Sequence, residues 1–461
     1  MKLIYKLLFT IVLSNSFVQA QITLDSTTID TSTIITGLDI PWEIQWGPDN
    51  WIWTTERYGR ISRINPNTGA QNILLDLSAT VHQAGESGLL GLALHPNFAD
   101  TAQVFLVYTY LDNSVMKERI VRYDYDSTNS NLHTPLILLD DIPAHNIHDG
   151  SRLLILPDHT LLITTGDANI QNNSQSLSSL NGKMLRLHLD GTIPSDNPIP
   201  NSPIWSWGHR NPQGLFLGPN NIVYSSEHGP GTDDEINIIE KGRNYGWPNV
   251  HGYCDLSTET QFCLDSNVYE PIQAWTPTVA TSDIVWYNHP AIPEFQNSIL
   301  LTTLKNKELI QIKMSSNHQQ AINNNALFTN YWGRLRDICI APDGRIFLAT
   351  NGPSSSNTNP FTHSIIELKN SNYTAVKPLV WQEAQPKLYP NPSTGISTLE
   401  IPHEFVDSPF VISNLLEQIV YQGSLNKKTL LNGALLSEGL YIIHILHPSE
   451  PSTLKWLVQK S

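Results

Sequence analysis

Short apolar segments preceded by turn residues recur along most of the chain. Five of them follow a Pro-Asp or Pro-Asn dipeptide, at Pro48-Asp49, Pro96-Asn97, Pro157-Asp158, Pro219-Asn220 and Pro342-Asp343. A turn dipeptide followed by alternating apolar residues is typical of the start of a β-strand. We therefore predict strands around residues 51–53, 161–163, 222–224 and 346–348.

The spacing of these turns indicates an internal repeat. The first four lie near 60 residues apart, and the last gap covers about two such periods. Residues 21–380 therefore have room for about six units, each long enough for a four-stranded antiparallel sheet with its loops. We predict an all-β fold built on a six-bladed β-propeller. A pair of β-sandwiches in which the turns recur by chance is the alternative.

The pattern changes after residue 380. A turn-rich segment from Lys387 to Gly395 is followed by short strand patterns at residues 410–412 and 439–443, and the chain ends in a basic segment, residues 455–460. These short strands predict a small β-sandwich-like module over residues 385–461.

The N-terminus has the organisation of a secretory signal peptide. Lys2 and Lys6 precede an apolar run from Leu7 to Leu13, which is short for a membrane span, and a small-residue cleavage site ends at Ala20. We predict that residues 1–20 are a signal peptide and that the protein is secreted or displayed at the cell surface. Disulfides are possible there. Cys254 and Cys263 are the candidate pair, whereas Cys339 lies in an apolar strand pattern and is predicted to be a buried free thiol.

Composition narrows the function further. The 461 residues carry a formal net charge of −15, with 27 basic and 42 acidic side chains, so no broad basic field is present to bind nucleic acid or an anionic membrane. Twelve Trp, 30 Pro and 26 Gly residues, with only 15% charged residues, favour a turn-rich β protein over a helical one.

Residues 207–247 contain an unusual density of Gly, Pro, carboxylate and aromatic residues. Glycines and prolines fix the backbone and leave carbonyl oxygens free, and two kinds of side chain add to them. Hard oxygen donors come from Asp233, Asp234, Glu235 and Tyr245, and hydrogen-bond donors from Arg210 and Asn211. This combination predicts a rigid loop that holds a hard cation and an anionic ligand. An acidic surface turn is the alternative.

A candidate catalytic base lies in a loop of Asp, Gly and Ser residues. His148 belongs to this loop, and Asp167 follows an apolar strand pattern. A carboxylate that accepts the Nδ1 proton would set the tautomer and leave Nε2 as the base. A solvated loop histidine without a catalytic role is the alternative.

Cations are scarce in this acidic chain, so the grouped ones are informative. Arg334 and Arg336 alternate along a predicted strand and therefore share one face. Two neighbouring guanidiniums repel each other unless they face an anion, and carboxylates are their usual bidentate partners. Lys305 and Arg210 are further candidates. Pairing with Asp337 and surface acids is the alternative.

A glycine-rich segment from Gly85 to Pro96 adds Glu86 as a residue that could reach a ligand. A buried strand entered through a glycine turn is the alternative. The segment is not a phosphate-binding loop, because no Gly-Lys-Ser/Thr follows. The sequence also lacks the His-Glu-x-x-His zinc motif and the Gly-x-Ser-x-Gly hydrolase motif.

Taken in order, these segments resemble the soluble pyrroloquinoline-quinone (PQQ) dependent sugar dehydrogenases, which include soluble glucose, aldose sugar and glucose/sorbosone dehydrogenases. The resemblance covers residues 35–370 and is most specific at Gly208–Gly214 and Asp233–Pro248. The family fold is a six-bladed propeller. The C-terminal module resembles the sorting domain of the type IX secretion system, through Tyr389-Pro390-Asn391-Pro392, residues 437–441 and the basic end. A carbohydrate-binding or cell-adhesion module is the alternative there.

The resemblance implies a role for each candidate residue. His148 would remove the C1 hydroxyl proton of an aldose while hydride passes to PQQ, and Asp167 would orient it. The cofactor would be held by Arg210 and Asn211 at the quinone oxygens, by Lys305, Arg334 and Arg336 at its carboxylates, and by Thr278 and Glu86 as further contacts. The carbonyls of Gly229 and Pro230 would hold the catalytic Ca²⁺, and Glu235 and Tyr245 a second, structural Ca²⁺.

The implied enzyme oxidises an aldose at C1 to the lactone and passes electrons to a quinone or cytochrome acceptor. The type IX secretion machinery is the implied export partner. Glu86 and His228 stand where soluble glucose dehydrogenase has glutamine, so the identity of the sugar is left open. Two other functions compete: a non-catalytic propeller that binds a glycan or protein, and a Ca²⁺-dependent propeller lactonase.

Overall fold

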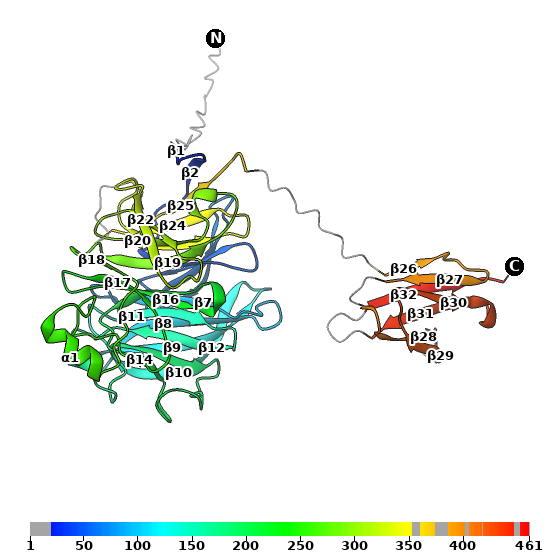
Figure 1. Ribbon diagram of the computed structural model, residues 1–461, viewed down its shortest axis with the longest axis horizontal. Helices are drawn as coiled ribbons and strands as arrows, with labels where there is room; N and C mark the ends of the chain where they lie inside the picture. The colour runs from blue at the N-terminus through cyan, green and yellow to red at the C-terminus, as the bar shows by residue number, and fades with distance from the viewer. Residues whose placement is uncertain are drawn as a thin grey trace, which may run out of the picture. The chain divides into compact units, whose positions relative to one another are not determined.

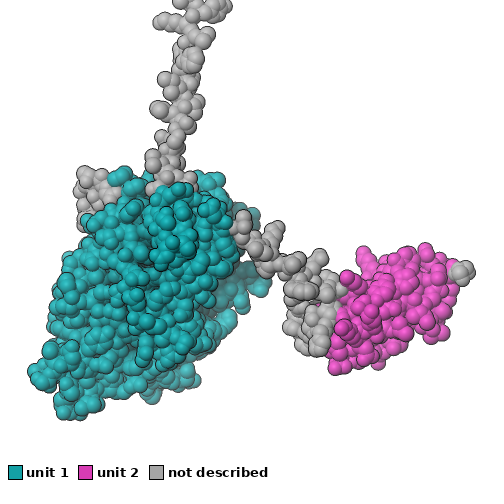
Figure 2. Space-filling model, turned by 45° about the horizontal axis from the view of Figure 1, so that its top comes forward, with its two compact units in different colours: residues 1–373 teal, residues 374–461 magenta. Residues whose placement is uncertain are grey.

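The computed structural model describes residues 20–352, 360–373, 386–401, 405–416, 418–446 and 452–460 (Figure 1). The chain divides into two compact units, residues 1–373 and residues 374–461 (Figure 2). Residues 1–19 of the predicted signal peptide lie outside the described residues. No helix in the part of the chain that the structure describes is long and apolar enough to cross a membrane.

The described strands of unit 1 form six antiparallel sheets, five of which contain four consecutive strands each. In chain order these five consist of β3 (Pro41–Trp46), β4 (Ile52–Glu56), β5 (Arg60–Ile64) and β6 (Gln71–Asp76); β7 (Leu89–Leu94), β8 (Gln103–Asp112), β9 (Val115–Asp126) and β10 (Asn131–Pro143); β11 (Gly150–Ile155), β12 (Thr160–Thr165), β13 (Lys183–His188) and β14 (Ile204–Trp207); β15 (Pro212–Leu217), β16 (Val223–Glu227), β17 (Asp234–Ile238) and β18 (Gln273–Trp275); and β19 (Thr281–Tyr287), β20 (Ser298–Thr303), β21 (Leu309–Met314) and β22 (Ala321–Leu327).

The sixth sheet joins the two ends of unit 1. It combines β23 (Leu335–Ile340), β24 (Ile346–Thr350) and β25 (Ile365–Lys369) with β2 (Thr28–Ile35) and β1 (Ala20–Thr23). β2 pairs antiparallel with β25, with Asp30 opposite Lys369. One strand of each sheet contacts a strand of the next. The contacts run in order through β3, β7, β11, β15, β19 and β23, and β23 contacts β3, so the six sheets form a closed ring. This arrangement is that of a β-propeller.

The predicted repeat corresponds to one position in the sheets. Each of the five Pro-Asp/Asn turns lies between the first and second strands of its sheet, before β4, β8, β12, β16 and β24. The acidic side chain helps to form the turn: Asp158 Oδ1 accepts the backbone N–H of Thr160 at 3.0 Å, and Asp49 Oδ1 accepts that of Trp51 at 3.2 Å. The sheet that begins with β19 has Pro290 and Pro293 at this place instead, so the dipeptide search missed it.

A buried charge cluster ties four of the first strands together. The Arg152 guanidinium in β11 lies 2.6 Å from Glu43 in β3, 3.0 Å from Asp337 in β23 and 3.5 Å from Asp283 in β19. Its guanidinium carbon also lies 4.4 Å from the centre of the Trp42 ring. Burial raises the pKa of Glu43 to about 8, although Arg152 opposes this shift. Charged groups that are buried away from water need partners of opposite charge. This cluster therefore specifies how β3, β11, β19 and β23 pack against one another.

Unit 2 contains two sheets that share one apolar core. One consists of β26 (Lys387–Tyr389), β27 (Ile396–Glu400) and β30 (Lys428–Asn432), and the other of β28 (Pro409–Asn414), β29 (Ile419–Ser424), β31 (Gly439–Ile445) and β32 (Ser452–Val458). Leu399 and Leu431 from the first sheet pack in one cluster with Phe410, Ile443 and Trp456 from the second.

The cysteine predictions are confirmed. Cys254 and Cys263 form a disulfide that ties the segment before α1 (Ser257–Asp265) to the helix itself, within the long connection between β17 and β18. Cys339 is a buried free thiol in β23.

Candidate active site

The predicted pair of His148 and Asp167 forms between two neighbouring strands. His148 precedes β11 and Asp167 follows β12; because these strands are antiparallel partners, the two loops meet at one end of the sheet. The distance from His148 Nδ1 to Asp167 Oδ1 is 2.8 Å. His148 has a φ of 64°, and Ala168 N donates to its carbonyl at 3.1 Å. A Cβ on Gly166 would lie 1.8 Å from that carbonyl oxygen, so only glycine fits there.

Asp167 is prepared for its task by three donors. Its side chain is 1% exposed, and Oδ1 also accepts the backbone N–H of Asn169 at 2.8 Å. Oδ2 accepts the indole N–H of Trp247 at 3.0 Å. With both oxygens accepting, the carboxylate orients Nδ1–H of His148 toward itself. Nε2 is then the lone-pair nitrogen, which suits a general base.

Glu86 contacts the backbone of the same histidine loop. Its Oε2 accepts the backbone N–H of His148 at 3.2 Å, and its own N–H donates to Asn146 O at 2.7 Å. Burial disfavours the ionised carboxylate, but His228, the His148 N–H and Arg336 outweigh burial and lower the pKa of Glu86. Glu86 is therefore a carboxylate that is bonded to the loop of His148 and lies close to Arg336.

Three arginines lie close enough together to perturb one another. Burial, together with the neighbouring Arg334 and Arg57, lowers the pKa of Arg336 to about 9. Arg336 Nη1 donates to Gln213 Oε1 at 2.7 Å, whereas the buried Nε atoms of Arg336 and Arg334 have no hydrogen-bond partner among the described residues. Buried cations with unmatched donors favour an anionic ligand.

Arg57 was not predicted from the sequence. It follows β4, and its guanidinium donates to the carbonyls of Gly85 and Ser87, so it holds the turn that carries Glu86. Burial lowers the pKa of Arg57, and the negative Glu86 opposes the shift. In the sequence Arg57 is a single arginine after a strand pattern. Its neighbours in the sequence do not distinguish it from an arginine on the surface.

Arg210 and Asn211 lie directly after the glycine turn at residue 208. Arg210 Nη1 donates to His228 O at 3.1 Å, and Asn211 Oδ1 accepts the Gly150 N–H at 3.2 Å. Arg210 Nε and Asn211 Nδ2 are buried and have no partner within the described ranges. Both residues thus keep a donor atom without a partner in the described structure.

Lys305 and Thr278 lie together beside the Gly-Pro-Gly loop. Lys305 Nζ donates to Thr278 Oγ1 at 3.0 Å, and Thr278 N donates to Gly231 O at 3.4 Å. Lys305 is exposed, in contrast to the buried Arg336. Lys305 is thus linked to the loop at Gly231 through Thr278.

The Gly229-Pro230 loop is shaped by Asp234. Asp234 Oδ1 accepts the Gly229 N–H at 2.8 Å, and Oδ2 accepts those of Val279 at 2.8 Å and Ala280 at 2.6 Å. A Cβ on Gly229 would lie 1.9 Å from Thr232 O, so the turn requires glycine. Asp234 is 1% exposed and fully engaged, so it supports the loop and is not the free oxygen donor expected from the sequence.

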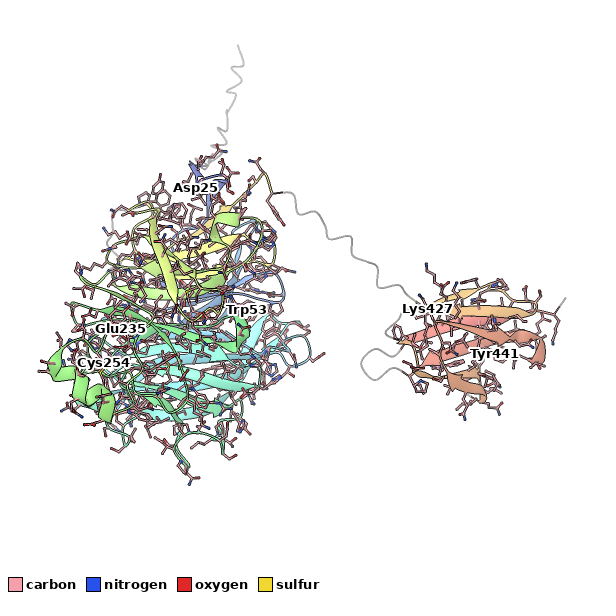
Figure 3. The ribbon with its side chains drawn as sticks, in the orientation of Figure 1. Asp25, Trp53, Glu235, Cys254, Lys427 and Tyr441 are labelled. Carbon is pink, nitrogen blue, oxygen red and sulfur yellow. A yellow bond between two sulfur atoms is a disulfide. The ribbon has the colours of Figure 1, made fainter. Side chains whose placement is uncertain are left out.

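Glu235 faces a second carboxylate across the sheet. It is the direct antiparallel partner of Glu227, and burial together with Glu227 raises its pKa to about 8. Like charges opposite each other destabilise a sheet unless a cation lies near them. Both side chains line one cavity together with Arg210, His228, Gly229, Pro230, Asp233, Tyr245, Trp247, Val250 and His251. Figure 3 labels Glu235 and Cys254; the Gly252 N–H donates to Glu235 Oε1 at 2.8 Å.

The Tyr245 hydroxyl makes two hydrogen bonds with the backbone. It donates to Ile238 O at 2.6 Å and accepts the Glu240 N–H at 2.8 Å, while the ring stacks on His209 at 4.5 Å. The hydroxyl is therefore engaged in the fold, and the backbone carbonyl is the oxygen that Tyr245 can offer to a cation. No group of three or more His, Cys, Asp or Glu side chains among the described residues is arranged to hold a metal.

The closed ring of sheets carries a His–Asp pair and buried arginine donors that have no partner among the described residues. The family model for glucose/sorbosone dehydrogenase matches residues 38–358, and the chain belongs to that family. The model of a secretion system C-terminal sorting domain matches residues 387–459.

Relatives of known activity match over most of their length. Quinoprotein glucose dehydrogenase B of Acinetobacter calcoaceticus is 32% identical over 406 residues, covering 70% of this chain and 85% of that protein. The aldose sugar dehydrogenase YliI of Escherichia coli is 30% identical, covering 71% and 91%. The structure of the PQQ-bound aldose sugar dehydrogenase of Streptomyces coelicolor is 30% identical with a TM-score of 0.65, covering 74% of this chain and 98% of that one.

Proposed function

We propose that the protein is a secreted, PQQ- and Ca²⁺-dependent dehydrogenase that oxidises an aldose at C1 to its lactone. One observation carries the proposal: buried donors of Arg210, Asn211, Arg334 and Arg336 have no partner among the described residues, and Glu86, which accepts the His148 N–H, lies close enough to Arg336 for each to affect the pKa of the other. A base alone would serve many reactions, but this donor set calls for a large anion with several acceptor groups. A relative named a quinoprotein and a PQQ-bound structural relative support the same choice.

The architecture that goes with this function has three parts. The six sheets of unit 1 would be the six blades of a propeller over residues 21–380, with β2 completing the last blade. The two sheets of unit 2 would form a β-sandwich sorting domain over residues 385–461, read by the type IX secretion machinery. Residues 1–20 would be the signal peptide, so the enzyme works outside the cell or at its surface.

PQQ fits the donors of the site. Its three carboxylates need cations, which Arg334, Arg336 and the exposed Lys305 would supply. Thr278 would be a further contact. Its quinone oxygens need donors, which Arg210 and Asn211 would supply. When bound, PQQ accepts the hydride of the substrate. Preorganised donors at oxygens that gain negative charge lower the barrier, because they need no reorganisation during the reaction.

Calcium fits the oxygen atoms of the neighbouring loop. Ca²⁺ takes carbonyl and carboxylate oxygens in flexible geometry. The carbonyls of Gly229 and Pro230 would hold the catalytic ion. Glu235 and the Tyr245 carbonyl would hold a structural ion, which would relieve the repulsion between Glu235 and Glu227.

The chain's own residues would carry the proton transfer. The C1 hydroxyl of the sugar donates to His148 Nε2, and its proton passes to that nitrogen as the C1–H bond breaks and hydride leaves. Asp167 holds Nδ1–H and stabilises the imidazolium that forms. The sugar thus loses one proton and one hydride and becomes the lactone. The electrons then pass to an external quinone or cytochrome acceptor.

A dye-linked assay across a panel of aldoses tests this function. We expect lactone formation that requires both PQQ and Ca²⁺. A propeller lactonase would instead open lactones with Ca²⁺ alone, and a non-catalytic propeller would bind a glycan or protein without turnover. Either result, with no PQQ-dependent oxidation of any aldose, would contradict the proposal.

Glu235→Gln is expected to remove most of the stabilisation that the protein gains from calcium. At a calcium concentration of 100 times Kd, the wild type gains about 2.7 kcal/mol, which appears as a rise in Tm. The variant keeps the shape of the side chain but cannot ionise, whereas Glu235 can release its proton when a cation binds beside it. Glu240→Gln, at a carboxylate paired with Arg243 on the surface, is the matched control and should keep the full rise. An equal rise in wild type and Glu235→Gln would place the ion elsewhere.

A further inference from the structure

Trp247 contacts both chemical halves of the site. It is 5% exposed, and its indole N–H donates to Asp167 Oδ2 at 3.0 Å. Its ring centre lies 5.2 Å from the guanidinium carbon of Arg210. The ring also stacks on the His251 imidazole, with centres 5.1 Å apart and planes 28° apart.

We propose that Trp247 is a positioning residue with two separable tasks: its N–H fixes the carboxylate that orients the base, and its ring fixes the arginine that faces the quinone oxygens. The inference rests on the proposed function for the roles of His148 and Arg210. The two contacts themselves are properties of the chain.

The N–H task follows from how Asp167 is bonded. Oδ1 accepts hydrogen bonds from His148 and Asn169. Among the described residues, the donor to Oδ2 is the indole N–H of Trp247. Without the indole N–H, this buried oxygen has no donor. A buried acceptor without a donor is costly, so the carboxylate would turn toward another donor and leave Nδ1 of His148 misaligned.

The ring task follows from how little else holds Arg210. Its Nη1 donates to His228 O at 3.1 Å, and its buried Nε has no partner among the residues described. An aromatic face attracts a guanidinium and gives it a flat support without consuming its N–H donors. Trp247 can therefore set the direction of Arg210 while leaving those donors for the ligand.

Contacts from three parts of the chain hold Trp247 in place. Gln175 Nε2 donates to Trp247 O at 2.7 Å, and the Trp247 N–H donates to Gly208 O at 3.0 Å. His251, which stacks on the ring, donates its backbone N–H to Glu259 Oε1 at 3.2 Å. Glu259 belongs to α1, between Cys254 and Cys263. Residues that precede Trp247 in the sequence and residues that follow it thus fix the position of its indole.

Two substitutions separate the two tasks. Trp247→Phe keeps a ring and loses the N–H, so kcat should fall at least about tenfold while the sugar KM and the Kd for PQQ stay within about twofold. Trp247→Leu loses both, so Kd for PQQ should also rise about tenfold. Trp205→Phe is the matched control, because Trp205 also lies against an arginine, Arg186 at 4.8 Å, and neither Asp167 nor Arg210 is among its partners in the described structure; it should leave all three values unchanged.

A second readout needs neither cofactor nor turnover. The Nδ1 proton of His148, held by Asp167, should give a downfield proton NMR resonance in the cofactor-free protein, which Asp167→Asn would assign by removing it. Trp247→Phe should shift or broaden this resonance, and Trp205→Phe should not. Wild-type kcat together with an unchanged resonance in Trp247→Phe would overturn the proposal. If wild type itself oxidises no sugar, the proposed function fails, whereas the NMR comparison still judges the bond between Trp247 and Asp167.

Discussion

His148→Ala is expected to lower kcat for sugar oxidation at least about a thousandfold while leaving the binding of PQQ nearly unchanged. General-base catalysis contributes about 10²–10⁴-fold, and the alanine side chain leaves no group to receive the C1 hydroxyl proton. The cofactor would be held by the arginines and by Asn211, and none of these depends on the His148 ring. Stopped-flow or dye-linked kinetics measure kcat, and fluorescence titration measures the Kd for PQQ.

The control for this variant is His159→Ala. His159 is an exposed histidine in the turn between β11 and β12, at the opposite end of the two strands that carry the catalytic pair. It should keep wild-type kcat. If His148→Ala keeps kcat within about threefold, another group receives the proton and the assignment of the base is wrong.

Arg334→Gln is expected to have the second large effect, on cofactor retention. Truncating one partner of a buried, hydrogen-bonded charge pair costs about 2–5 kcal/mol, so the Kd for PQQ should rise from about 30-fold to more than a thousandfold. At saturating PQQ, kcat should change little, because Arg334 lies at the cation cluster and not at the reacting atoms. Equilibrium titration of the cofactor-free protein measures the Kd.

The stability of the cofactor-free variant separates this account from a purely structural role. Arg334 repels Arg336 and helps to lower its pKa, so removing one cation should leave the Tm of the cofactor-free protein equal or slightly higher. Arg345→Gln is the control, since Arg345 pairs with Asp343 and Glu367 away from the site and should not alter the Kd for PQQ. A normal Kd in Arg334→Gln, or a large loss of Tm, would contradict the assignment.

The sequence predicted the sheets well because their turn chemistry is local. An Asp that accepts an N–H two residues later leaves a signature that needs no knowledge of the rest of the chain, as Asp158 and Thr160 show. Closure of the ring was harder to predict. β2 pairs with β25 across more than 300 residues, as in the pair of Thr31 and Leu368, and only the meeting of the two ends reveals it.

The geometry was predictable where one residue's chemistry is distinctive: His148 pairs with Asp167, and Arg334 and Arg336 lie close together. It was not predictable where a role depends on tertiary contacts. Arg57 matters because the turn at Gly85 folds against it, and that contact cannot be read from its neighbours in sequence. For the same reason the bonding of the Tyr245 hydroxyl could not be predicted: its partners Ile238 and Glu240 come close only in the folded loop.

The central claim is most directly tested by single turnover without any added electron acceptor. The cofactor-free protein is loaded with PQQ and Ca²⁺ under anaerobic conditions, each aldose is added in excess, and the absorbance of the cofactor is followed. We predict a change that corresponds to reduction of one PQQ per protein with at least one aldose, and its loss in His148→Ala. A cofactor that stays oxidised with every aldose, or that is reduced equally fast in His148→Ala, would contradict the account.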